Sequence, residues 1–119
     1  MSQAIVFDDG RYNGRTLREW LPEVVERIVQ RFDPVRVVLF GSLADGTEDR
    51  DSDIDLLVVL DEVEDKRASM LELQRATSDF PAPLGLIPTD PGEIERRGDL
   101  VGSILRPALS HGRVLYERT

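Results

Sequence analysis

Two acidic residues at the start of an apolar run carry the clearest indication of chemistry in this sequence. Asp53 and Asp55 are separated by one residue and lead into five aliphatic residues, 56–60. Such a run predicts a strand buried on both faces, and residues two apart in a strand point to the same side. Two neighbouring carboxylates repel each other unless a cation neutralises them. Mg²⁺, which proteins hold with few carboxylates and with substrate phosphates, fits this position. The alternative is a charged strand end that is simply solvated.

A glycine–serine pair lies upstream of these acids. Residues 35–40 form a second apolar run that ends at Gly41 and Ser42, and ten residues separate Ser42 from Asp53. If the two runs form antiparallel strands, the end of the first and the start of the second meet at one edge of the sheet. Glycine allows a backbone to approach a ligand closely, and Ser42 can begin a helical turn whose N–H groups attract phosphate. The pair and the acids together predict a site for a nucleoside triphosphate and its metal.

The motif Gly41-Ser42, ten residues, Asp53-x-Asp55 resembles the signature of the minimal nucleotidyltransferases (MNT), small members of the DNA polymerase β-like superfamily. The resemblance extends over residues 17–116 and implies an α/β (α+β) nucleotidyltransferase fold, a mixed β-sheet flanked by helices. It implies that Gly41 and Ser42 bind the nucleotide, with ATP as the expected substrate. It also implies that Asp53 and Asp55 are catalytic and bind Mg²⁺. The implied reaction transfers a nucleotidyl group, AMP in the case of ATP, to a hydroxyl.

The same resemblance suggests a partner. Many minimal nucleotidyltransferases resemble antitoxins encoded beside HEPN-domain ribonuclease toxins, and some of them silence the toxin by adding AMP to it. A HEPN-type protein is therefore the implied partner, with one of its hydroxyls as the acceptor. The 119 residues of the chain leave no separate module to hold an acceptor, which favours an acceptor on another protein. Transfer to a small molecule in the cleft of a homo-oligomer, as in antibiotic-modifying relatives, is the other possibility.

The sequence departs from the family pattern where a third carboxylate is expected. In relatives this acid binds a metal and helps to remove the proton of the attacking hydroxyl; aligned on Pro83, its position is Gly85. Loss of a general base slows a reaction about 10²–10⁴-fold. Asp90 does not replace the acid, because Asp90-Pro91-x-Glu93 is typical of a helix N-terminus. A second class of function is therefore an impaired nucleotidyltransferase domain that neutralises its partner by contact.

Other residues and motifs are interpreted more simply. Leu43 occupies a position where many relatives carry a basic residue that could contact phosphate. Phosphatases and glycosyltransferases that use Asp-x-Asp place it after an apolar strand, whereas here it precedes one. Trp20 is interpreted as a packing residue, and His111 as a residue of the last helical turn, where a cation is favourable.

Composition limits the remaining classes of function. The length predicts a single domain over residues 1–119. The absence of cysteine excludes disulfides and thiolate metal sites. No apolar run approaches the roughly 20 residues of a membrane span, and the N-terminus lacks a signal-peptide pattern, so a cytoplasmic protein without a membrane partner is expected. A net charge of −8 disfavours direct binding to nucleic acid.

Hydrophobic spacing predicts the elements that position the site. An amphipathic helix is predicted over 17–32, with Thr16 and Glu19 as a capping box. Pro22 either kinks this helix or begins its main part. Residues 4–15 predict a short edge strand followed by turns. The other predictions are a helix over 64–80, an extended segment over 84–87, a helix over 99–110 that ends at Gly112, and an edge strand over 114–116.

Overall fold

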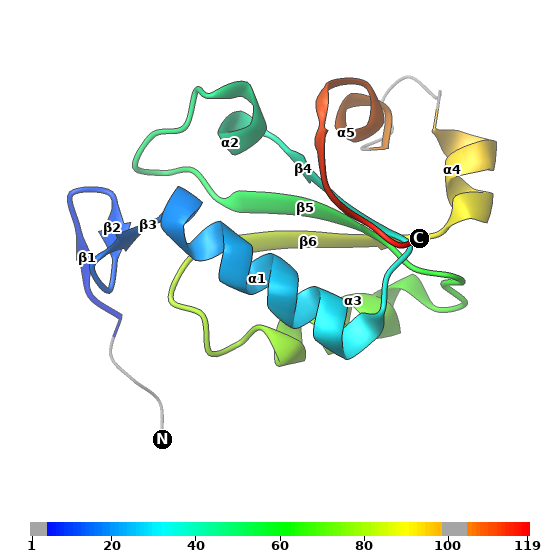
Figure 1. Cartoon of the computed structure of the whole chain (residues 1–119), viewed down its shortest axis with the longest axis horizontal. Helices are drawn as coiled ribbons and strands as arrows, with labels where there is room; N and C mark the ends of the chain where they lie inside the picture. The colour runs from blue at the N-terminus through cyan, green and yellow to red at the C-terminus, as the bar shows by residue number, and fades with distance from the viewer. Residues whose placement is uncertain (1–4, 99–104) are drawn as a thin grey trace.

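The computed structural model describes residues 5–98 and 105–119, and it shows helices on both faces of a mixed sheet (Figure 1). The helices are α1 (Leu17–Phe32), α2 (Ser42–Asp45), α3 (Lys66–Ala76), α4 (Pro91–Arg97) and α5 (Leu105–His111). The strands are β1 (Phe7–Asp8), β2 (Arg11–Tyr12), β3 (Arg15–Thr16), β4 (Arg36–Phe40), β5 (Ile54–Val59), β6 (Leu84–Thr89) and β7 (Arg113–Glu117). The predicted α/β fold class is confirmed.

The main sheet has the strand order β6-β5-β4-β7. β4 pairs antiparallel with β5, as predicted, with Phe40 opposite Asp55. β6 pairs parallel with β5, with Gly85 opposite Asp55. β7 pairs antiparallel with β4 and forms the edge strand predicted near the C-terminus. The sheet therefore brings residues from three separate segments to the level of Asp55.

The continuous apolar run of β5 is explained by helices on both of its faces. Ile54, Leu56 and Val58 belong to one hydrophobic cluster, whereas Leu57 and Val59 belong to another. The first cluster includes side chains from α1 and α3, and the second includes side chains from α5; Figure 1 shows these helices on opposite faces of the sheet. Full burial of one such side chain contributes about 1.5–3 kcal/mol. Strand periodicity places Asp55 on the face of Leu57 and Val59.

Helix α1 begins at Leu17, so the alternative in which the main helix begins at Pro22 is wrong. The predicted capping box is present: the Glu19 N–H donates to Thr16 Oγ1 at 3.2 Å, and the Thr16 N–H donates to Glu19 Oε1 at 3.0 Å. Pro22 lies inside the helix and is exposed. The missing proline N–H removes one intrahelical bond, but the cap and the buried face with Val24 and Ile28 maintain the helix.

The N-terminal segment differs from the prediction, because it does not form an edge strand of the main sheet. β1, β2 and β3 form a small antiparallel sheet of their own. Its tight turns contain Gly10 and Gly14 with positive φ, a backbone conformation that tight hairpins require. The Trp20 Nε1–H donates to the Tyr12 carbonyl at 2.8 Å and joins this sheet to α1. Trp20 also meets the Phe80 ring edge-on, with 6.0 Å between the ring centroids, which confirms its packing role.

The remaining elements agree with the predictions in place but not in length. α3 is shorter than the predicted 64–80 at both ends: Asp65 caps its start by accepting from the Ala68 N–H, and Thr77 is its C-terminal cap. β6 is longer than the predicted 84–87 and includes Pro88, which an edge strand tolerates. Of the helix predicted over 99–110, residues 99–104 lie outside the described part; α5 ends at His111, just before Gly112, as predicted. Within the described ranges, no helix is long and apolar enough to cross a membrane.

Candidate nucleotide and metal site

Gly41 lies beside Asp55, as the antiparallel pairing of β4 and β5 predicts, and Ser42 follows it in the chain. Phe40 is opposite Asp55, so Gly41 is the next residue beyond this pair. A Cβ built on Gly41 would overlap Asp55 Oδ2. The backbone of Gly41 and the carboxylate of Asp55 are therefore in direct contact, without a side chain between them.

The backbone of Gly41 adopts a conformation that other residues avoid. Its φ of 77° and ψ of −162° lie in a region that is essentially restricted to glycine. This conformation turns the chain from β4 into α2, which begins at Ser42 as predicted. The N–H groups of Ala44 and Asp45 donate to the Gly41 carbonyl at 3.1 and 3.2 Å, whereas the first two N–H groups of the helix, those of Ser42 and Leu43, have no intrahelical acceptor. Ser42 Oγ donates to Ser52 Oγ at 2.9 Å, which ties the turn to the loop before β5.

Asp53 and Asp55 stand at the start of β5 and influence each other. Asp55 is half-buried on the strand, whereas Asp53 is exposed just before it. Burial raises the pKa of the Asp55 carboxyl above its ordinary value, and the negative charge of Asp53 raises this pKa further. Ionised Asp55 is thus destabilised in the folded protein. A cation bound between the two carboxylates would remove this penalty.

Gly85 lies on the strand beside Asp55, where the family pattern would place the third acid. The two residues are register partners in the parallel pair of β5 and β6. A Cβ on Gly85 would lie only 2.5 Å from Asp55 Oδ1. In the described ranges, 5–98 and 105–119, no three His, Cys, Asp or Glu side chains form a group that could hold a metal. The site therefore consists of two carboxylates and two glycines.

Asp90 is remote from these acids and acts as a helix cap. It follows Thr89, which pairs with Val59 at the other end of β5. Its side chain accepts from the Glu93 N–H at 2.7 Å and from the Val63 N–H at 2.8 Å. The Glu93 N–H, followed by that of Val63, lowers the pKa of Asp90. The interpretation of Asp90 as a cap is confirmed.

Arg18, which no sequence pattern indicated, supports the turn after β4 from a distant helix. Its guanidinium donates to the Leu43 carbonyl at 2.9 Å and forms an ion pair with Glu48 at 2.5 Å. Leu43, where many relatives carry a basic residue, is fully buried here. Arg18 belongs to α1 and reaches α2 across 25 positions of the sequence, so no local pattern could have indicated this contact.

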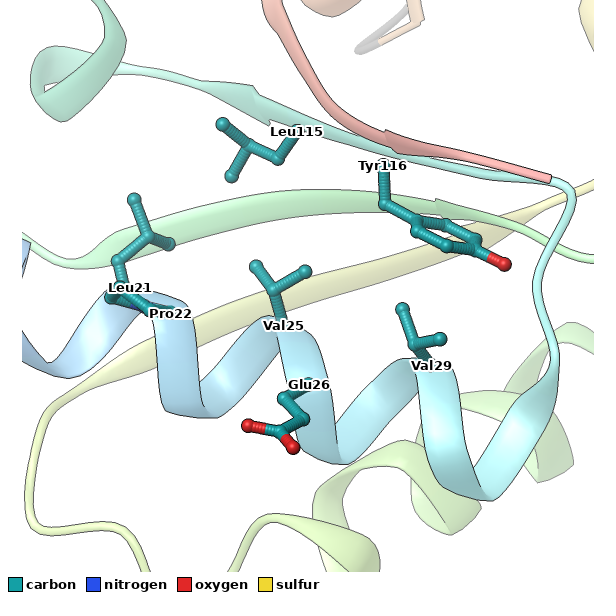
Figure 2. A pocket seen from close by; sticks show the side chains of 7 residues that line it. All are labelled: Leu21, Pro22, Val25, Glu26, Val29, Leu115 and Tyr116. Carbon is teal, nitrogen blue, oxygen red and sulfur yellow. The ribbon is translucent and has the colours of Figure 1, made fainter.

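Two hollows of the surface differ in chemistry. A cleft of about 350 Å³ that includes charged side chains lies beside α2 and is lined by Asp9, Gly10, Thr16, Leu17, Arg18, Leu43, Glu48 and Asp49. An apolar groove of about 460 Å³ lies between α1 and β7; Figure 2 shows its lining side chains, Leu21, Pro22, Val25, Glu26, Val29, Leu115 and Tyr116. A groove with one charged residue suits apolar groups and not a triphosphate.

The fold of this chain is similar to the folds of two solved structures. A protein from Sulfolobus solfataricus, described as a candidate nucleotidyltransferase, matches with a TM-score of 0.61 and 23% identity, covering 86% of this chain and 81% of that chain. A chain of a mutant MntA–HpeT toxin–antitoxin matches with a TM-score of 0.58 and 21% identity, covering 82% of this chain and 72% of that chain. Both likenesses show a nucleotidyltransferase-like fold.

The sequence then identifies the family. The model of the nucleotidyltransferase domain family matches residues 18–106. The chain belongs to the nucleotidyltransferase domain family, as its motif predicts. No curated protein matches this sequence.

Proposed function

We propose that this chain binds a nucleoside triphosphate with Mg²⁺ and transfers its nucleotidyl group, AMP from ATP, to a hydroxyl of a partner protein. One observation carries the proposal: in a nucleotidyltransferase domain, Gly41 and Asp55 are in contact where β4 ends and β5 begins. This contact places a helix-starting turn, with its backbone N–H groups, beside a pair of carboxylates. Phosphate needs the first and its metal needs the second.

The two carboxylates fit Mg²⁺ in charge and in donor type. Asp53 and Asp55 provide hard oxygen donors. Burial raises the pKa of Asp55, and repulsion by the charge of Asp53 raises this pKa further. Mg²⁺ in proteins is commonly held by one or two carboxylates, with substrate phosphates and water as its other ligands. When bound there, Mg²⁺ would neutralise phosphate charge and orient the leaving group. Gly41 and Ser42 would hold the triphosphate itself.

The proposed reaction is a displacement at the α-phosphorus. The acceptor hydroxyl oxygen forms a bond to this phosphorus, while the bond to the oxygen that bridges the α- and β-phosphates breaks. Pyrophosphate leaves, and the nucleotidyl group remains on the acceptor. In the described part of the chain no third carboxylate joins Asp53 and Asp55, so the proton of the hydroxyl passes to water. We therefore expect a slower transfer than a site with three acids would support.

The proposed partner is a HEPN-type toxin in the same cytoplasm, with this chain as its antitoxin. Two observations support a protein partner. One is the fold likeness to a chain of the MntA–HpeT toxin–antitoxin. The other is the apolar groove between α1 and β7, since exposed apolar surface often marks a protein contact.

The experiment is transfer of labelled AMP to the purified partner, followed by mass spectrometry of the product. We expect the wild type to add AMP in a Mg²⁺-dependent manner, and Asp53→Asn combined with Asp55→Asn to add none. Asp51→Asn is the matched control, because Asp51 is a nearby exposed acid outside the strand. A wild type that binds no Mg²⁺·ATP in calorimetry would contradict the proposal.

Gly85 specifically favours a second candidate function, in which the chain neutralises its partner by contact. In that case Asp53→Asn combined with Asp55→Asn still protects cells from the toxin, whereas Leu115→Arg does not. Leu115 is 38% exposed and lines the groove, so a charge there disturbs the surface and not the core. Loss of protection in the acid variant, with protection intact in Leu115→Arg, would exclude this alternative.

A further inference from the structure

We infer that this site holds one divalent cation, and that the carboxylate of Asp55 fills the space that ligands of a second cation would need. The inference rests on the proposed function, because it concerns the cation that accompanies the nucleotide. It adds the number of cations and a physical role for Gly85. Both follow from the contacts of Asp55 with the two neighbouring strands.

Asp55 lies in a notch between two glycines. Asp55 is on β5. Gly41, just after β4, lies on one side of it, and Gly85 on β6 lies on the other side. A Cβ on Gly85 would be 2.5 Å from Asp55 Oδ1, and one on Gly41 would overlap Oδ2. Real Cβ atoms essentially never approach other heavy atoms closer than 3.0 Å. The carboxylate therefore occupies, on each side, the volume that a side chain would occupy.

The notch explains why Gly85 is more than a missing ligand. A residue with a side chain at this position would displace Oδ1, so Asp55 can adopt its present orientation only beside a glycine. With Asp55 in this orientation, the start of β5 and its neighbouring strands, which we call the rim, carries two acids, Asp53 and Asp55. No third metal-binding side chain joins them within the described residues.

Two carboxylates are sufficient for one cation and insufficient for two. Mg²⁺ requires six oxygen ligands in an octahedron, and two carboxylates with phosphates and water can complete one such set. In two-metal sites the cations lie about 3.5–4 Å apart, so their repulsion must be offset by further negative ligands. Asp53 is exposed and Asp55 is wedged between glycines. Neither is supplemented by an acid that could bridge to a second ion.

The structure also predicts how a third acid would act. In Gly85→Asp the new Cβ forces Asp55 to rotate away from β6, which a short side chain with one free end can do. The rim then carries three carboxylates and can hold a second cation. Gly85→Asn is the matched variant, because it brings the same volume and the same displacement of Asp55 without the charge.

Native mass spectrometry with Mn²⁺ and α,β-methylene ATP, which cannot release pyrophosphate, counts the cations in the complex. We expect one Mn²⁺ for each nucleotide-bound wild-type chain, two in Gly85→Asp and one in Gly85→Asn. Two Mn²⁺ in the wild type would overturn the inference and leave the proposed function intact. Absence of any nucleotide complex would overturn both. If Gly85→Asp does not fold, the wild-type count still decides between one cation and two.

Discussion

Replacement of Gly41 by alanine tests the contact on which the site depends. The backbone of Gly41 lies in a region that is essentially restricted to glycine, and another residue there costs about 1–3 kcal/mol. The new Cβ would also overlap Asp55 Oδ2, so this carboxylate must rotate, and an off-rotamer side chain costs about 0.5–1.5 kcal/mol. We therefore expect Gly41→Ala to lower the free energy of unfolding by about 1.5–4.5 kcal/mol. This is a large share of the roughly 5–15 kcal/mol that stabilises a typical domain.

Gly46→Ala is the matched control for this substitution. Gly46 has a φ of 76° and a ψ of 18°, and nothing lies within 4 Å of a Cβ built there. Its replacement adds only a left-handed backbone penalty of roughly 1–2 kcal/mol. Urea denaturation followed by the fluorescence of Trp20, the single tryptophan, measures both changes.

A double-mutant cycle separates the two contributions at Gly41. In the Asp55→Ala background the overlap is absent, so Gly41→Ala should cost about 0.5–1.5 kcal/mol less than in the wild type. The cost of Gly46→Ala should be the same in both backgrounds to within about 0.5 kcal/mol. The reasoning is refuted if Gly41→Ala costs the same with and without the Asp55 carboxylate.

Three further predictions concern pH dependence, capping and the core. The pKa of Asp55 is raised in the folded state by burial and then by Asp53, so the associated stability is complete below the ordinary carboxyl pKa and is lost as the pH rises through the raised pKa. Asp55→Asn should therefore be more stable than the wild type at neutral pH and equally stable in acid. Chemical denaturation across this pH range measures both proteins, and a difference in their free energies of unfolding that did not change with pH would contradict the prediction. Thr16→Ala removes the cap of α1 and should cost about 1 kcal/mol in the same assay, and no loss would mean that the capping box is not maintained in solution. Leu57→Ala empties a fully buried position and should cost about 2–5 kcal/mol, whereas Leu71→Ala, at an exposed position, should cost far less.

Local patterns were sufficient for the elements that carry the site. The apolar runs before Gly41 and after Asp53 predict β4 and β5 because both faces of these strands are covered. Thr16 with Glu19, and Asp90 with Pro91, predict the starts of α1 and α4 because caps act within one helical turn. The spacing of these signals also predicts that Gly41 meets the acids, since a short connection between antiparallel strands returns the chain to the same edge.

Local sequence patterns do not predict the small N-terminal sheet or the apolar groove between α1 and β7. Ile5, Val6 and Phe7 have the composition of a strand, but the turns at Gly10 and Gly14 let the segment pair with itself. The groove depends on a bulge in β7: adjacent residues of β4 pair with Val114 and Tyr116, which leaves Leu115 as an extra residue. Figure 2 shows that both Leu115 and Tyr116 line the groove beside α1. Alternation along the sequence would place them on opposite faces.

Residue types and their spacing predict which residues bind a nucleotide and its metal, and they locate a glycine, Gly85, where the family pattern leads one to expect a third acid. The packing of distant segments in the folded chain places Gly85 directly opposite Asp55 and puts the carboxylate in the notch between Gly85 and Gly41. The same packing brings Arg18 to the turn after β4. The difference arises from the range of the interactions. Hydrophobic periodicity and caps act over a few residues, whereas strand register and side-chain contacts depend on segments that meet only after the chain has folded.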